Sequence, residues 1–241
     1  MKQAYLLSFF SLLLCCTSCR FVGGKRVEGD GNRVTVNRSV GEFKGVEVRG
    51  GIDVVLVSGN GHSIRIEADQ NLIDFIEVNN DGGTVEVSSR DGYNLRSSKG
   101  IKVYATAPAF ENVSVAGSGD IRSEGKVTSN GALQLAIKGS GDIQLAVDAP
   151  RVATEISGSG SAKLEGQTRE FEAEINGNGD VHAFNLLSES AKVDIAGSGN
   201  AEVFASKQLN VEIKGAGDVA YKGSGTVSQK IMGSGSVRQV Q

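Results

Sequence analysis

Seven residues with polar oxygen-bearing side chains occupy the same position of a repeating turn, directly after a pair of glycines. In chain order they are Asp120, Asp142, Ser161, Asp180, Asn200, Asp218 and Ser236. If these residues stack, neighbouring carboxylates would approach the separation of roughly 5–5.5 Å that retaining glycosidases use. However, only Asp120 and Asp142 are consecutive acids, and alternation with neutral residues relieves like-charge repulsion. Because Asp, Asn and Ser bond nearby backbone amides in turns, we predict that they stabilise the turn.

Other residues that commonly carry out catalysis are sparse. Histidine occurs only as His62 and His182, which are separated by 120 positions in exposed-looking turn and strand contexts. Neither belongs to a Ser–His–acid signature. The Gly-Ser-Gly units lack the Lys-Ser/Thr pair of a phosphate-binding loop. The sequence therefore predicts no catalytic residue and no cofactor.

Metal and nucleic-acid binding are not predicted. All three cysteines lie at positions 15, 16 and 19, so the remaining chain has no thiolate for zinc and no disulfide. Calcium-binding solenoids use a nine-residue repeat that is absent here. The formal net charge is −3 with both signs interspersed, and no basic patch suits a phosphate backbone.

The turns that carry these polar residues belong to a repeat. A Gly-x-Gly unit recurs seven times, and its first glycines are separated by 22, 19, 19, 20, 18 and 18 residues. The predicted structural turn residues are Gly117, Gly119, Asp120, Gly139, Gly141, Asp142, Gly158, Gly160, Gly177, Gly179, Asp180, Gly197, Gly199, Gly215, Gly217, Asp218, Gly233 and Gly235. Two positions before each first glycine stands a β-branched apolar residue: Val115, Ile137, Ile156, Ile175, Ile195, Ile213 and Ile231.

Apolar residues alternate with polar ones on both sides of each turn, which predicts two strands per repeat, each with one buried face. Two short strands and two turns within about 19 residues fit one coil of a β-solenoid. We therefore predict an all-β, single-stranded solenoid with Gly-x-Gly corner turns and coils about 4.8 Å apart. The β-branched residues would form one hydrophobic column, and glycine would permit a positive φ at the corner.

We expect a single elongated domain over residues 29–241, with irregular coils in 29–112 and the seven repeats in 113–241. Shorter strands are expected at 43–48, 52–57, 64–66, 84–87 and 101–104. For residues 71–76 an irregular connection feeding a strand is favoured over the alternative, a helical turn. Gln229 and Gln239 take inward positions in the last coil. They either blunt an open end or mark a place where two open ends pair.

The N-terminus indicates export. Lys2 precedes an apolar stretch over 5–14 that is too short to span a bilayer permanently. Small residues before Cys19 resemble a bacterial lipoprotein signal. We therefore predict a signal peptide over 1–18, a lipid on Cys19, and a tether over 19–28. Cys16 as the lipidated residue, or a signal peptide without lipid, are the alternatives.

Motifs in the N-terminal half, taken together with the repeats, resemble one known family. Phe43…Val46…Val48, Gly51-Ile52-Asp53-Val54, Asn71-Leu72-Ile73-Asp74 and Pro108…Phe110-Glu111-Asn112-Val113 precede the Gly-Ser-Gly-Asp turns. Together they are similar to the "putative auto-transporter adhesin, head GIN domain" family over about residues 42–236. The resemblance implies a right-handed parallel β-helix without conserved catalytic residues, lipoprotein character, and a role in adhesion. It implies no functional residue.

We therefore expect a non-enzymatic cell-envelope lipoprotein that acts as an adhesion or binding module, held on the membrane by its lipid, with a polysaccharide or protein ligand. A carbohydrate-active enzyme (polysaccharide lyase or glycosidase) and a structural spacer without ligand are the alternatives. A homo-oligomer is compatible with each of these three functions. Outer-membrane placement on the periplasmic face is favoured over the cell surface, because residues 20–26 contain no acidic cluster.

Overall fold

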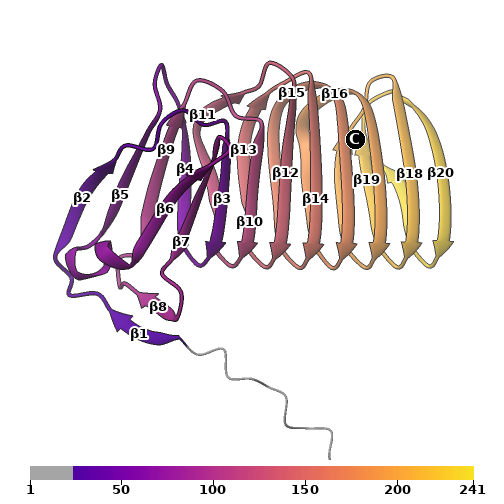
Figure 1. The fold of residues 1–241 in the computed structure, drawn as a ribbon. Helices are drawn as coiled ribbons and strands as arrows, with labels where there is room; N and C mark the ends of the chain where they lie inside the picture. The colour runs from indigo at the N-terminus through magenta and orange to yellow at the C-terminus, as the bar shows by residue number, and fades with distance from the viewer. Residues whose placement is uncertain (1–23) are drawn as a thin grey trace, which may run out of the picture.

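Strand β12 (Ala132–Gly139) shows how the sequence builds the fold. Its apolar residues Leu133, Leu135 and Ile137 are buried, and the residues between them are half-buried or exposed. Such a strand has one apolar face, which must pack against another element. The computed structural model describes residues 24–241, and there the chain meets this need by winding into a β-solenoid (Figure 1). The predicted signal peptide and Cys19 lie outside the described residues.

The elements have the following bounds. The strands are β1 (Lys25–Glu28), β2 (Arg33–Arg38), β3 (Gly45–Gly50), β4 (Asp53–Ser58), β5 (Ser63–Asp69), β6 (Ile76–Asp81), β7 (Thr84–Ser89), β8 (Tyr93–Arg96), β9 (Lys102–Ala107), β10 (Asn112–Gly117), β11 (Ile121–Thr128), β12, β13 (Ile143–Asp148), β14 (Arg151–Gly158), β15 (Ser161–Gly177), β16 (Asp180–Gly197), β17 (Asn200–Phe204), β18 (Gln208–Gly215), β19 (Asp218–Lys222), β20 (Thr226–Gly233) and β21 (Ser236–Gln239). A 3-10 helix, η1 (Gln70–Phe75), follows β5.

Each repeat contributes one strand to each of two walls. Along the first wall, parallel pairing joins β3, β10, β12, β14, the end of β15, the end of β16, β18 and β20. Along the second wall it joins β4, β11, β13, the starts of β15 and β16, β17, β19 and β21. The Gly-x-Gly units make the corner between the walls. The predicted solenoid and its corner turns are confirmed.

The predicted hydrophobic column is confirmed as well. In the ladder, Val115 pairs with Ile137, Ile137 with Ile156, and so on in the same register to Ile231. From Val115 to Ile213 every member is at most 2% exposed. Full burial of one such side chain stabilises the fold by about 1.5–3 kcal/mol. Ile231 is the exception at 36% exposure, because no further coil is stacked on it.

The stack departs from chain order at its N-terminal end. The coil β3–β4 lies between β7–β9 on one side and β10–β11 on the other. The chain therefore forms the β3–β4 coil first and then continues through β5 and β6. β7 and β9 next pair with β3 and β4 on one side of this coil, and the repeats begin with β10 and β11 on its other side. The irregular coils expected over 29–112 do continue the solenoid, but in a different spatial order.

The N-terminal end of the stack is closed by elements that leave the solenoid pattern. β5 pairs antiparallel with both β2 and β9, and β6 pairs antiparallel with β7. η1 buries Leu72 and Ile73 between them. The irregular connection predicted for 71–76 is wrong here, because these two apolar residues close the core by a helical turn. Residues 25–28 of the expected tether form β1, which pairs with β8.

Candidate functional site

The corner between the walls is a row of glycines in close contact. The first glycine of each unit has a positive φ, for example 140° at Gly117 and 130° at Gly139. This is the conformation that the sequence predicted, and residues other than glycine rarely adopt it. A Cβ on Gly139 would also lie 2.4 Å from the carbonyl oxygen of Gly117. The corner of each coil therefore rests directly on the corner before it.

The second glycine is required for a different reason. Its φ is not in the left-handed region, yet a Cβ on Gly160 would lie 2.1 Å from the carbonyl oxygen of Gly141 and 2.7 Å from Cγ2 of Ile137. These distances are well below an ordinary carbon–oxygen contact of roughly 3.3 Å. Close stacking of coils, and not backbone conformation, excludes side chains at this position.

The polar residues after the corner form a hydrogen-bonded ladder. Oδ1 of Asp120 accepts the amide of Asp142 at 3.1 Å, and Oδ1 of Asp142 accepts the amide of Ser161 at 2.8 Å and its hydroxyl at 2.9 Å. A second run begins at Asp180, which accepts the amide and side chain of Asn200. It continues from Asn200 through Asp218 to Ser236. Each acceptor thus fastens the next coil. The sequence had predicted bonds that stabilise the turn itself, whereas these bonds join neighbouring coils.

Asp53 is a member of this ladder that the sequence analysis did not assign. Its Oδ1 accepts the amide of Asp120 at 3.3 Å. Asp53, Asp120 and Asp142 therefore follow one another in three consecutive coils, so the acids alternate less than chain order suggested. Burial, followed by the neighbouring charges of Asp53 and Asp142, raises the pKa of the Asp120 carboxyl, although the amide of Asp142 opposes the shift.

The middle residue of every Gly-x-Gly unit is exposed along the outside of the corner. These residues are Ser118, Ser140, Ser159, Asn178, Ser198, Ala216 and Ser234. Their side chains are small. Their backbone amides already donate to the corner of the preceding coil, for example Ser140 to the carbonyl oxygen of Gly117 at 2.9 Å, so the outside of the corner is a strip that offers mainly hydroxyl groups. Consecutive coils in a parallel ladder are about 4.8 Å apart, which gives the strip a regular spacing.

At its N-terminal end this strip forms one side of a groove of about 990 Å³. The corner contributes residues of three neighbouring coils, Gly50 to Ile52, Gly117 with Ser118, and Gly139 with Ser140. The opposite side is formed by Ser89 to Arg96, together with Gly24 and Ile101. Figure 1 shows β8 and β1 as a two-stranded ribbon beside this corner. We define these lining residues as the corner groove.

The ribbon is held in place by contacts behind it. The Phe75 and Tyr93 rings pack with centroids 4.7 Å apart. The Arg90 guanidinium lies 5.4 Å from the Phe75 centroid and donates to the backbone oxygen of Asp74. Asn94 and Arg96 remain exposed, and Arg96 forms no ion pair with another described residue. The corner groove therefore offers serine hydroxyls, the side-chain amide of Asn94, the Arg96 guanidinium and part of the Tyr93 ring.

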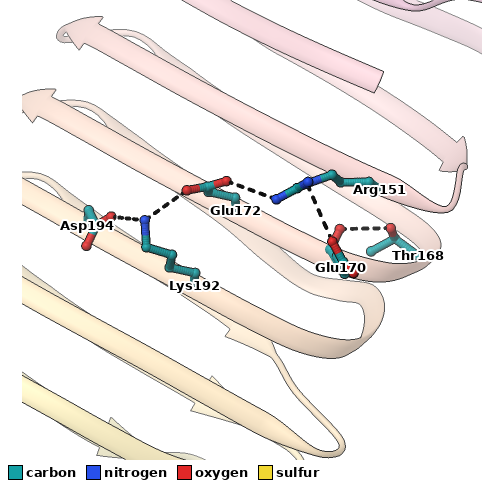
Figure 2. Close-up of polar contacts among 6 residues, drawn as sticks. All are labelled: Arg151, Thr168, Glu170, Glu172, Lys192 and Asp194. Atoms are coloured by element: carbon teal, nitrogen blue, oxygen red, sulfur yellow. Dashed lines mark hydrogen bonds and ion pairs between the residues drawn. The ribbon is translucent and has the colours of Figure 1, made fainter. Parts of the chain in front are cut away.

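A second polar surface covers the outside of the first wall. Figure 2 shows Arg151 between Glu170 and Glu172, with Nε–Oε2 and Nη2–Oε2 distances of 3.5 and 3.7 Å. Nζ of Lys192 lies 2.9 Å from Oε1 of Glu172 and 2.7 Å from Oδ2 of Asp194, so Lys192 bridges the two carboxylates. Hydrogen bonds to Asp194 and Glu172 raise the pKa of Lys192. These charges satisfy one another across coils, so the surface is less available to a ligand than the corner groove.

The two histidines lie apart from each other and from the ladder. Nδ1 of His62 accepts the backbone amide of Phe43 at 3.2 Å, and the two rings pack edge to face. His62 is therefore half-buried and packs against Phe43, whereas the sequence had suggested an exposed turn residue. His182 on β16 contacts Glu202 at 2.9 Å. Among residues 24–241 no group of three His, Cys, Asp or Glu side chains is placed to hold a metal ion.

No helix in the described part of the chain has the length and apolar character needed to cross a bilayer. The N-terminal motifs and the Gly-Ser-Gly-Asp turns together resembled one family, and the model of that family, described as "putative auto-transporter adhesin, head GIN domain", matches residues 42–225. No curated protein matches the chain significantly.

Solved structures share the fold. A "putative adhesin" from Bacteroides fragilis is 22% identical, with a TM-score of 0.81 over 89% of this chain and 100% of its own. A "putative lipid binding protein" from Parabacteroides distasonis is 22% identical with a TM-score of 0.73, and a "putative adhesin" from the same species is 24% identical with 0.71. Each covers 90% of this chain and 100% of its own. At these identities the likeness establishes the fold alone.

Proposed function

Since the chain belongs to the "putative auto-transporter adhesin, head GIN domain" family, we propose that it is a non-enzymatic binding module of the cell envelope that holds an extended polysaccharide in the corner groove. The observation that carries this proposal is the meeting of the exposed hydroxyl strip with the β8 ribbon across a groove of about 990 Å³. The adhesin and lipid-binding names of the similar structures concern those proteins, and they are compatible with a module that binds without catalysis.

The chemistry of the corner groove suits a sugar chain. Hydroxyl groups of a polysaccharide exchange hydrogen bonds with serine hydroxyls such as those of Ser118 and Ser140, and the Asn94 side chain adds a donor and an acceptor. Tyr93 lines the groove and adds apolar ring surface for contact with the carbon-bound hydrogens of a sugar. The flat strip of small residues lets a long chain continue past the groove along the corner, as extended solenoid surfaces allow.

Binding of a panel of purified polysaccharides, measured by calorimetry, tests the proposal. Ser118→Tyr fills the corner groove and should abolish binding. Ser198→Tyr makes the same change at an equivalent corner outside the groove and should leave binding intact. Loss in both variants would indicate that the ligand follows the whole strip, and loss in neither would refute the groove as the site.

The same panel separates binding from catalysis. Three consecutive carboxylates, Asp53, Asp120 and Asp142, are the one arrangement that favours a carbohydrate-active enzyme. Their oxygens already accept backbone amides of the next coil, which supports a structural role. Release of sugar products that disappears in Asp120→Asn or Asp142→Asn would refute the binding-only proposal.

We also propose that Cys19 carries the lipid that holds the module on the membrane, on the periplasmic side of the outer membrane. Cys19 precedes Gly24 of the corner groove by five residues, and a chain of this length spans at most about 18 Å. The groove would thus face material near the membrane. Mass spectrometry of the mature N-terminus tests the lipid on Cys19 against Cys16, and Cys19→Ser should release the protein from membranes. Protection from protease in intact cells tests the periplasmic placement.

A further inference from the structure

The two ends of the solenoid are finished differently. At the N-terminal end, Leu72 and Ile73 of η1 are buried and antiparallel strands flank the walls. At the other end, β20 pairs only with β18 and β21 only with β19 among the described strands. No residue of β20 or β21 is buried, although Val227 and Val237 are half-buried. The last coil therefore presents free backbone donors and acceptors along two strands.

Exposed large apolar side chains concentrate on this coil. Within the described chain three are exposed, and two of them are Ile231 at 36% and Met232 at 42%. The third is Leu187, at 54% exposure on β16. Ile231 continues the column that is buried in the preceding coils, and no described coil lies on its other side. An edge of this kind is a template for strand addition.

We propose that the last coil binds a second copy of this chain, with β20 antiparallel to the β20 of that copy and Gln229 on the twofold axis. In this register Val227 faces Ile231 of the second copy, and Ser228 faces Lys230. Thr226 faces Met232 in the same way. Apolar residues thus meet on the inward side, and no like charges are directly opposite, which would be destabilising.

Two further features fit this arrangement. Gln229 lies four residues before the first corner glycine, Gly233, and Gln239 lies four after the second, Gly235. Both therefore reach the same height above the corner, so one axis perpendicular to the walls can pass both. The Gln229 amide meets its own copy as donor and acceptor, whereas Nε2 of Gln239 already donates to the carbonyl oxygen of Gly223 at 2.8 Å. At the other end η1 buries Leu72 and Ile73, and β2 and β6 are each paired on one side only, so that end presents a different surface from β20 and β21. The contact is isologous and the assembly stops at a dimer.

Analytical ultracentrifugation of the full chain over a wide concentration range tests the proposal. The expected result is a monomer–dimer equilibrium that Ile231→Lys weakens about tenfold or more, the effect of losing a central interface contact. Leu187→Lys makes the same change at the other exposed apolar residue and should leave the equilibrium unchanged. A monomer at every concentration, equal effects of the two variants, or assemblies larger than a dimer would each overturn the proposal.

Disulfide cross-linking tests the β20–β20 register directly, without a variant that destabilises the dimer. In a chain with Cys15, Cys16 and Cys19 replaced by serine, Gln229→Cys should form an intermolecular disulfide on mild oxidation, because residue 229 faces itself. Ser228→Cys faces Lys230 and should cross-link much more slowly. Preferential cross-linking through Ser228→Cys would exclude this register. Neither measurement depends on the polysaccharide proposal, so each can fail without the other.

Discussion

Substitution of the second corner glycine is the strongest test of how the coils are held together. We expect Gly160→Ala to be severely destabilising, although the φ of Gly160 is accessible to alanine. Its Cβ would lie 2.1 Å from the carbonyl oxygen of Gly141, so the two coils must separate by about 1 Å to restore an ordinary contact. The amides of Ser159 and Gly160 donate to the carbonyl oxygen of Gly139 at 2.9 and 3.2 Å. Such a separation stretches both bonds beyond useful length.

The magnitude follows from these contacts. Two weakened hydrogen bonds cost about 1 kcal/mol each, and overpacking against Ile137 adds about 1–3 kcal/mol. The expected loss is therefore about 3–5 kcal/mol in the free energy of unfolding, or roughly 6–20 °C in Tm for a protein of this size. Thermal and urea unfolding followed by circular dichroism measure this loss.

The matched control is Gly131→Ala. Gly131 also lacks a positive φ, and a Cβ there would meet nothing within 4 Å. Alanine restricts the unfolded chain, so this variant should be neutral or more stable by up to about 1 kcal/mol. If Gly160→Ala and Gly131→Ala unfold alike, the corner does not depend on close stacking and the reasoning is wrong.

Three further predictions follow from individual side chains. Asp69 is fully buried, and neither of its side-chain oxygens has a hydrogen-bond partner among residues 24–241. Asp69→Asn should therefore raise the free energy of unfolding at pH 7 by roughly 1–3 kcal/mol, and a loss of stability in urea would contradict this. Folding raises the pKa of Asp120, so the folded state binds the Asp120 proton more tightly than the unfolded state does. The contribution of Asp120 to the free energy of unfolding is therefore present at low pH and is lost as the pH rises through the folded-state pKa. Asp120→Asn, which keeps an acceptor for the amide of Asp142, should therefore lessen the decline in stability above pH 4 in urea titrations; an unchanged pH profile would count against it. Lys192 bridges Glu172 and Asp194 on an exposed surface, so Lys192→Met should cost at most about 1 kcal/mol, and the cost should vanish in high salt.

The solenoid was predictable because its determinants are local and periodic. The apolar residue two positions before each corner repeats from Val115 to Ile213, and each one occupies the same column. The positive φ of the first glycine also followed from residue type. The need for the second glycine did not, because it arises from the carbonyl oxygen of another coil. No sequence pattern within one repeat indicates that a carbonyl oxygen of the neighbouring coil lies so close to the second glycine.

The N-terminal half was harder to predict because its contacts are not sequential. Asp53 precedes Asp120 in the ladder, yet 67 positions separate them, since β5 to β9 intervene in the chain. The corner groove was missed for the same reason. Its sides come from the corners and from the β8 ribbon, and Tyr93 and Arg96 carry no signal that distinguishes them from ordinary strand residues.

A stack whose two ends differ has a direction, and pairing through β20 and β21 reverses that direction in the second copy. β1, where the described chain begins, lies at the opposite end (Figure 1). In the proposed dimer the two β1 strands would therefore be at opposite tips of a rod twice the length of one solenoid. If each tip is tied to lipid, such a rod can join two facing bilayers, and its length would fix the gap between them.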